Sequence, residues 1–124
     1  MTNKPNRWLF LVMDAKLIQF VEASKRSVIC FTFHRTPEDQ LKECLAGRSQ
    51  IKSGSMHEKW RAKDYCLWDD MDADGVVDVV ELRWNWDPFY TAMGEYWESI
   101  GGTWGGRFNN GGKDGFADPY HFEF

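Results

Sequence analysis

One short segment, DMDADGVVDVVE, carries carboxylates at the spacing of a calcium-binding loop. They stand at positions one, three, five, nine and twelve of the segment, with a glycine at position six. Calcium takes six to eight oxygen ligands, and the glycine permits the sharp turn that brings those ligands round one ion. The pattern predicts side-chain, water-mediated and backbone-carbonyl ligands from Asp70, Asp72, Asp74, Val76, Asp78 and Glu81.

The segments on either side of this loop do not complete an ordinary EF-hand, which has a helix on each side. AKDYCLWDD before the loop is short and aromatic-rich and opens with an alternation, so it predicts a strand. VVELRWNW at the end of the loop lacks a clean helical period. We therefore expect an EF-type loop inserted into another fold. A solvated acidic loop without a metal is the alternative.

The acidity of the chain is concentrated in this loop. The chain has 124 residues, of which 43% are hydrophobic, and a net charge of −4. Those values suit one globular domain over residues 1–124 with a modest core. Residues 69–81 hold six of the 19 acidic side chains, which leaves 13 acidic against 15 basic side chains elsewhere. Because the basic residues form no run, composition indicates no nucleic-acid partner.

Cysteine usage and hydropathy bear on the cellular compartment. Cys30, Cys44 and Cys66 are odd in number and lack metal-ligand spacing, which favours reduced thiols. The apolar run WLFLVM is too short for the apolar region of a signal peptide, and no stretch is long enough to span a membrane. We expect a monomer that is made in a cytoplasm without a signal peptide and contacts no membrane.

Periodicity and capping residues predict an α+β fold with a small antiparallel sheet and flanking helices. Thr36-Pro37 and Asp87-Pro88 each resemble an N-cap followed by proline at the first helical position. Gly101-Gly102 is a stop signal for the last helix. The predicted helices cover about residues 7–25, 37–47 and 88–100, and the predicted strands cover about 28–33, 55–58, 62–67 and 120–124.

Two further stretches contain histidines beside carboxylates, SMHEKWRAKD over 55–64 and DPYHFEF over 118–124. His57 and Asp64 are expected on neighbouring strands and His121 on the last strand, where they make a His2Asp set. A catalytic zinc ion takes three protein ligands and lowers the pKa of a bound water to about 7. Asp118 is placed to accept the proton. Spacing alone leaves open that these histidines are ordinary surface or core residues.

Four short motifs occur in the order and spacing typical of one enzyme family, from about Arg35 to the C-terminus. They are Ser55-x-His57, Ala62-x-Asp64, TWGGRF over 103–108 and Asp118-x-x-His121. In these motifs the chain resembles the peptidoglycan metallopeptidases of the D-alanyl-D-alanine peptidase type, which share a fold with the zinc site of hedgehog signalling domains. Within that group it is most similar to phage endolysins that cut the L-alanyl-D-glutamate bond.

The resemblance implies a role for each matching residue. It implies His57, Asp64 and His121 as zinc ligands and Asp118 as the general base. It also implies an arginine near the substrate after the first strand, and Arg35 matches that position.

Four other residues near these motifs have open alternatives. Trp60 stands where the family has glycine, so the turn is built differently or the indole adds an aromatic wall to the groove. Ser55 is expected either to orient a ligand or touch substrate, or simply to form a turn. Glu123 is expected either to support a zinc histidine or to be a surface strand residue. His34 is expected to be a solvated surface residue.

These observations together predict a zinc-dependent peptidase that hydrolyses an amide bond of the peptidoglycan stem peptide, L-alanyl-D-glutamate first. The calcium loop would stabilise or activate it, and the enzyme would act on the bacterial cell wall after release from the host cytoplasm. One alternative is a D,D-carboxypeptidase or D,D-dipeptidase acting on D-Ala-D-Ala. Others are a non-catalytic binding module held together by zinc and calcium, and a calcium-binding virion or adhesion protein.

Overall fold

The computed structural model describes residues 3–46, 56–57, 59–84, 87–115 and 117–124. Its helices are α1 (Asn3–Ala23), α2 (Pro37–Leu45), α3 (Pro88–Ser99) and the short α4 (Phe108–Gly111), with single 3-10 turns at Val79–Glu81 and Gly105–Arg107. Its strands are β1 (Ser27–Thr32), β2 (Ala62–Trp68), β3 (Thr103–Trp104) and β4 (His121–Glu123). Within these described residues, no helix is long and apolar enough to cross a membrane.

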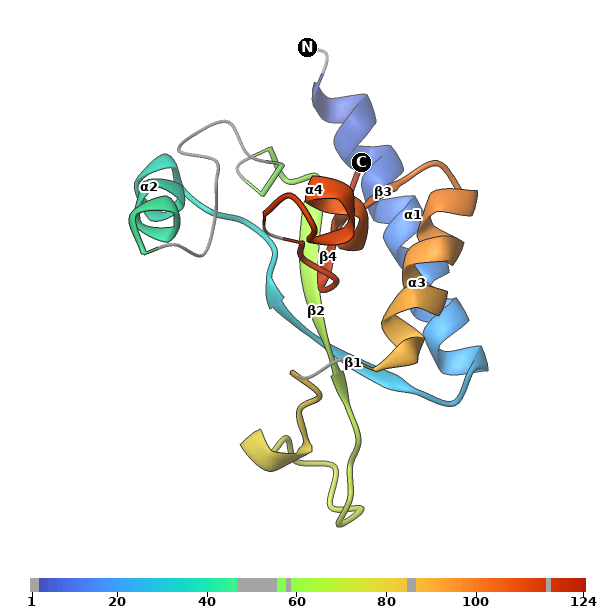
Figure 1. Ribbon diagram of the computed structural model, residues 1–124. Coiled ribbons are helices and arrows are strands. Elements are labelled where there is room, and N and C mark those ends of the chain that lie inside the picture. Colours follow the sequence, from blue (N-terminus) through green and yellow to red (C-terminus); the bar gives the residue numbers. More distant parts are fainter. Residues whose placement is uncertain (1–2, 47–55, 58, 85–86, 116) are drawn as a thin grey trace.

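The four strands form one antiparallel sheet in the order β1-β2-β4-β3. α1 and α3 lie side by side against this sheet (Figure 1). β2 is the long central strand, and β4 pairs only with its first three residues. In this register Asp64 lies between Thr32 of β1 and His121 of β4. The sheet therefore places β4, near residue 121, directly beside the first residues of β2, near residue 64.

The buried faces of the helices follow from the period of their apolar residues. Phe10, Met13, Leu17 and Val21 recur every three or four positions along α1, and all four lie in the core. The ring of Phe10 meets that of Trp97 from α3 edge to face, with 5.8 Å between centroids. Tyr65, Leu67 and Phe122 complete this core from the sheet, together with Tyr90, Met93 and Trp104.

The N-terminal caps predicted for the second and third helices are present. The hydroxyl of Thr36 accepts a hydrogen bond from the Asp39 backbone N–H at 3.1 Å. The Asp87 carboxylate accepts one from the Phe89 N–H at 2.8 Å. Each cap satisfies a backbone donor that has no partner within its helix, and a proline follows directly.

The predicted α+β class is confirmed, and one predicted strand is wrong. Met56 and His57 lie in a turn rather than in a strand over 55–58. The turn is closed by the N–H of Arg61, which donates to the Met56 carbonyl at 2.9 Å. His57 therefore does not lie on a strand beside the one that carries Asp64. Ser55 lies outside the described residues.

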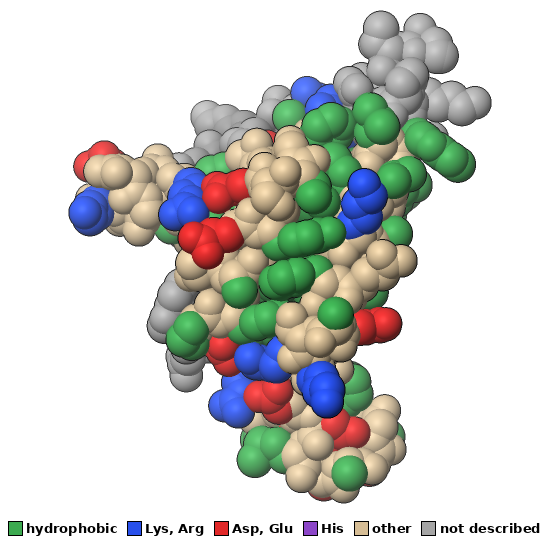
Figure 2. Space-filling view, turned by 90° about the vertical axis from the view of Figure 1, so that its right-hand side faces the viewer, with side chains coloured by type: hydrophobic (Ala, Val, Ile, Leu, Met, Phe, Trp, Pro, Cys, Tyr) green, Lys and Arg blue, Asp and Glu red, His purple; other side chains and the backbone are tan. Residues whose placement is uncertain are grey.

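The loop after β2 projects away from the sheet, at the end opposite to the N-terminus (Figures 1 and 2). Its residues 71–80 are all exposed. Figure 2 looks at the helical side of the molecule, where hydrophobic side chains lie exposed among charged ones. The exposed hydrophobic side chains of α1 include Trp8, which is 68% exposed, and Leu9, which is 48% exposed.

Candidate metal centre

Three residues that are far apart in the sequence form a compact buried cluster. One ligand atom from each of His57, Asp64 and His121 lies within 4.8 Å of the others. His57 Nε2 is 3.2 Å from Asp64 Oδ2, and His121 Nδ1 is 3.0 Å from Asp64 Oδ1. The side chains are almost inaccessible to solvent, with residue exposures of 2%, 3% and 8%. The structure thus brings together the three residues predicted to hold zinc.

The second ring nitrogen of each histidine is held by an oxygen outside the cluster. His57 Nδ1 lies 3.0 Å from the Phe33 carbonyl oxygen, and His121 Nε2 lies 2.7 Å from Glu123 Oε1. Such partners fix the ring orientation and leave the other nitrogen free to bind a metal. The contact of Glu123 is the one expected of a residue that supports a metal-binding histidine.

Electrostatics at the centre favour a positive charge. Burial raises the pKa of Asp64, but hydrogen bonds from His121 and His57 outweigh it and bring the pKa to about 2. Burial lowers the pKa of His121, but hydrogen bonds to Asp64 and Glu123 bring it to about 9. Both shifts reflect carboxylates that stabilise a cation among them. A divalent metal ion would supply that positive charge in place of a proton, so the donor set fits zinc.

Asp118 lies in the segment that leads into β4. Its backbone N–H donates to the Gly105 carbonyl at 2.9 Å, and its Oδ1 accepts from the Tyr120 N–H at 3.2 Å. Burial raises the pKa of the Asp118 carboxyl, the charge of Asp64 raises it further, and His121 opposes both. A buried carboxylate with a raised pKa is a better proton acceptor than a solvated one.

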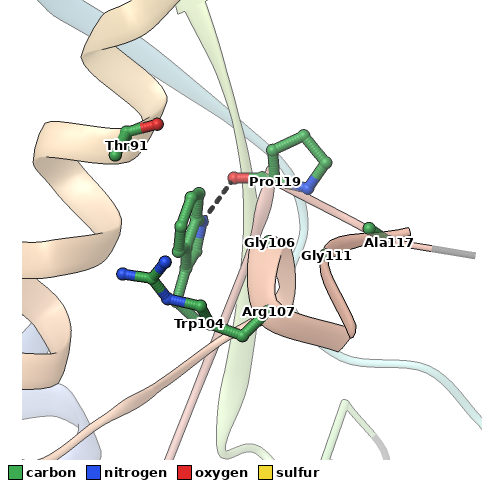
Figure 3. Close-up of a pocket in the computed structure, with 7 residues that line it drawn as sticks. All are labelled: Thr91, Trp104, Gly106, Arg107, Gly111, Ala117 and Pro119. Atoms are coloured by element: carbon green, nitrogen blue, oxygen red, sulfur yellow. Dashed lines mark hydrogen bonds between the residues drawn. The ribbon is translucent and has the colours of Figure 1, made fainter. Parts of the chain in front are cut away.

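The TWGG motif supports the segment that carries Asp118. A Cβ on Gly105 would lie 2.3 Å from the Asp118 carbonyl oxygen and 2.8 Å from the His121 Cβ, so only glycine fits there. The Trp104 indole N–H donates to the Pro119 carbonyl at 2.9 Å (Figure 3). The motif is singled out from the sequence by resemblance alone, but only the structure shows that it packs directly against the candidate site.

A pocket of about 340 Å³ lies beside that support. Figure 3 shows it between α3 and the segment before β4, with the Arg107 guanidinium over the Trp104 ring at 5.2 Å. Arg107 is also paired with Glu98 at 3.1 Å. The pocket is lined by Thr91, Trp104, Gly106, Arg107, Gly111, Ala117 and Pro119. Among the residues that the structure describes, this lining includes no histidine or carboxylate that could bind a metal.

Arg35 reaches the cluster from the segment after β1. Its guanidinium lies 3.4 Å from Asp64 Oδ2 and donates to Gln40 Oε1 at 3.0 Å. A further contact with Glu43 is 3.8 Å long. Arg35 therefore links α2 to the aspartate of the cluster. Its predicted role in holding substrate stays a prediction.

Trp60 occupies the glycine position of the family in a left-handed conformation, with φ of 61°. That backbone conformation is the one glycine adopts easily, so the turn keeps it despite the large side chain. The indole, 39% exposed, stacks on the His34 ring at 3.8 Å with planes 9° apart. His34 is exposed as predicted, but its ring packs on Trp60, which sequence reasoning missed.

The predicted calcium loop brings its carboxylates into two overlapping groups. Oxygens of Asp70, Asp72 and Glu81 lie within 4.8 Å of one another, and so do those of Asp72, Asp74 and Asp78. The exposed carboxyl of Asp72 shares a hydrogen bond with that of Asp74, which raises its pKa to about 6. The pKa of Asp72 rises because like charges are crowded there, and a proton shared between two carboxylates relieves their repulsion.

The backbone of the loop has the turn that a calcium site needs. Gly75 has φ of +71°, and its N–H donates to Asp70 Oδ2 at 2.8 Å. Asp70 Oδ1 is buried without a hydrogen-bond partner in the described part of the chain. Glu81, 2% exposed, points into the loop and accepts from the Met71 N–H at 2.8 Å. A cation would satisfy the unpaired oxygen, so the residues present fit calcium.

Val76 is the one predicted calcium ligand that would bind through its backbone. Its N–H donates to Asp74 Oδ1 at 2.8 Å, and its side chain is 58% exposed. The role of its carbonyl as a ligand stays a prediction.

The described elements define an α+β fold in which helices back an antiparallel sheet and a buried His–Asp–His cluster joins two of its strands. The L-Ala D-Glu endopeptidase ChiX of Serratia marcescens is a solved structure with a similar fold. The TM-score is 0.54 and the sequence identity 21%, over 80% of this chain and 67% of that chain. At this identity the likeness establishes the fold. No protein-family model matches the chain, and neither does any curated protein.

Proposed function

We propose that this protein is a zinc-dependent peptidase that hydrolyses the L-alanyl-D-glutamate bond of the peptidoglycan stem peptide. The observation that carries the proposal is the buried His57–Asp64–His121 cluster, in which both histidines turn one ring nitrogen inward and have the other fixed from outside. The fold shared with an L-Ala D-Glu endopeptidase supports this bond before D-Ala-D-Ala.

His57, Asp64 and His121 would hold the zinc ion. Bound zinc supplies a Lewis acid that polarises the scissile carbonyl and lowers the pKa of water to about 7. Three protein ligands suit this chemistry, because a catalytic site keeps a coordination position open. Glu123 and the Phe33 carbonyl keep the two imidazoles in the required orientation.

The remaining residues handle protons and the substrate. Asp118 accepts a proton from the attacking water and delivers it to the leaving amine, and its raised pKa makes it a stronger base for the first transfer. Arg35 holds a substrate carboxylate or the developing oxyanion, since its guanidinium already lies beside Asp64. The backbone of Asp118 is held by Gly105, which keeps this base close to the cluster.

The loop over residues 70–81 is proposed to bind calcium. Its five carboxylates, its glycine turn and the unpaired oxygen of Asp70 support that proposal. The base of the loop is joined to β2, the strand of Asp64, because the N–H of Arg83, which follows the loop, donates to the Leu67 carbonyl at 2.8 Å. Calcium would therefore stabilise the base of the loop and could also activate the enzyme.

Mass spectrometry of peptidoglycan fragments tests the proposed reaction. Purified, zinc-loaded protein should expose new L-alanine carboxyl termini and new D-glutamate amino termini in cell walls. The Asp118→Asn variant, tested in parallel, should release neither. Release of terminal D-alanine would instead identify a D,D-carboxypeptidase, and intact walls would indicate a non-catalytic binding module.

A further inference from the structure

Three aromatic side chains form an exposed cluster beside the candidate site. Phe31 and Trp84 are each 45% exposed, and Tyr120 is half-buried between them. The ring centroids lie 5.0 Å apart for Phe31 and Trp84, 5.5 Å for Trp84 and Tyr120, and 6.2 Å for Phe31 and Tyr120. The three planes meet at angles of 71–72°. We call Phe31, Trp84 and Tyr120 the aromatic platform.

Contacts with Tyr90 and with the Trp84 backbone hold the Tyr120 ring of the platform in place. Tyr120 meets the buried ring of Tyr90 edge to face, at 5.1 Å and 88°. The Tyr120 hydroxyl donates to the Trp84 carbonyl oxygen. Phe31 lies where the pairing of β1 with β2 shifts register between Cys30 and Thr32. Because Tyr90 and the Trp84 carbonyl hold the Tyr120 ring, that ring loses little conformational entropy when it binds a ligand, which favours binding.

The platform adjoins the residues proposed for catalysis. Tyr120 directly precedes His121, and its backbone N–H donates to the Asp118 carboxylate at 3.2 Å. Phe31 directly precedes Thr32, which pairs with Asp64. These contacts place the platform next to the segment that carries Asp118 and His121.

The stem peptide has no aromatic residue, but it is attached to a sugar. A pyranose ring presents a face of C–H groups, which buries apolar area when it stacks on an aromatic ring. The stem joins the muramic acid ring through a lactyl group and then L-alanine. An extended chain spans about 3.3–3.6 Å per residue, so the L-alanyl-D-glutamate bond lies about 7 Å from the sugar. A terminal D-Ala-D-Ala bond lies three residues farther along the stem, about 17 Å from the sugar.

We propose that the aromatic platform binds the muramic acid ring of the glycan strand while the adjoining stem peptide lies at the metal centre. This inference rests on the proposed function and adds the sugar to its substrate. It also accounts for the choice of bond, because a sugar held at Tyr120 places the first amide bonds of the stem, and not the last, at the cluster. The position of the bound sugar would thus determine which bond of the stem peptide is cleaved.

Two substrates separate sugar binding from a structural role of the rings. One is the soluble disaccharide with its attached stem peptide, and the other is the same stem peptide without sugar. In Trp84→Ala, KM for the disaccharide peptide should rise about five- to tenfold, the order expected for one lost aromatic contact. Its kcat, and both constants for the sugar-free peptide, should stay unchanged. Trp8→Ala removes an exposed tryptophan of α1 and should behave as wild type.

A binding measurement keeps this inference separate from the proposed reaction. Titration of the protein with the free disaccharide, followed by NMR, should shift signals of the platform in wild type and Trp8→Ala but not in Trp84→Ala. Phe31→Ala should weaken binding similarly and replaces Trp84→Ala if that variant does not fold. If the disaccharide binds saturably but no stem peptide is cleaved, the sugar-binding role of the platform stands and the proposed peptidase activity is rejected. Equal losses on both substrates, or disaccharide binding that does not depend on Trp84, would overturn the inference.

Discussion

The two candidate metal sites of this protein are built in opposite ways. His57, Asp64 and His121 are at most 8% exposed and come from a turn and two paired strands. Residues 71–80 of the acidic loop are all exposed and lie in one continuous segment. The first site is assembled by the core, so its geometry exists whenever the chain is folded. The second depends on a short segment whose carboxylates repel one another until a cation arrives.

This difference predicts that the two metals have different roles, one in the reaction and one in the stability of the fold. The buried centre already contains its orienting partners, so zinc adds chemistry to a fixed arrangement. The exposed part of the loop is held mainly by hydrogen bonds within the loop, such as that from the Gly75 N–H to Asp70, so calcium adds stability to the segment itself. Each prediction below tests one side of this contrast.

Loss of one buried ligand should have the largest effect. His57→Ala, Asp64→Ala and His121→Ala should each lose bound zinc and all wall-lytic activity, because two protein ligands do not hold the ion in place. Elemental analysis and a zymogram on cell walls measure both. His34→Ala is the matched control, since that histidine is exposed and lies outside the cluster. Wild-type zinc content in all three variants would refute the ligand assignment.

Asp118→Asn should keep zinc but lose most turnover. Asparagine retains an oxygen for the Tyr120 N–H but cannot accept a proton, so kcat should fall about 10²–10⁴-fold. Steady-state kinetics on a stem peptide measure the loss, and zinc content shows that the centre is intact. Asp114→Asn, an exposed position in the same segment, should keep full activity. A fully active Asp118→Asn would mean that another group is the base.

Calcium should stabilise the protein through the exposed loop. A ligand that binds only the folded state adds about 2.7 kcal/mol at a concentration one hundred times its dissociation constant. Melting curves with chelator and with calcium measure this effect on zinc-loaded protein. Magnesium should be a poor substitute because it requires a tighter octahedral shell. Glu81→Gln should abolish the response and leave zinc bound, because position twelve supplies the bidentate ligand.

The same experiment decides between the two roles of calcium. If calcium raises both the melting temperature and wall lysis, the loop influences the buried centre through β2. If it raises only the melting temperature, the loop is a local support and the two sites are independent. A wild-type protein that responds in neither assay would refute calcium binding.

The last prediction concerns the metal-free buried centre. The pKa of His121 rises from 6.5 to about 9 on folding, so its stabilising contribution is complete below pH 6.5 and is lost as the pH rises through 9. The pKa of Asp64 falls from 3.8 to about 2, so its contribution is present above pH 3.8 and is lost as the pH falls through 2. Zinc-free protein should therefore be less stable at pH 9 than at pH 6.

Urea unfolding of the zinc-free protein at the two pH values measures this difference. Glu123→Gln removes one of the two charges that raise the His121 pKa, so its stability should change less over the same range. An identical pH dependence in both proteins would show that Glu123 does not contribute to the shift.

Elements whose signals are local were predicted well from the sequence. The caps at Thr36 and Asp87 bind backbone groups two or three residues away, so their residue types alone indicate where the helices begin. The four carboxylates and the glycine at 70–78, with Glu81, are likewise recognisable because one short segment holds the whole set. The turn at His57 was mistaken for a strand, because it is closed by Arg61 and lies against the Phe33 carbonyl.

The sequence by itself determined the three longer helices, though not the short α4, and it determined the strand of Asp64 and the acidic loop, since these depend on residues close together in the chain. Only the tertiary structure decided that His57 faces His121, 64 positions away, and which nitrogen of each ring points inward. It alone brought Phe31, Trp84 and Tyr120 together, from three separate segments. The physical reason is that a ligand set, a ring orientation or an aromatic surface is a property of packing, and packing joins residues that no local pattern connects.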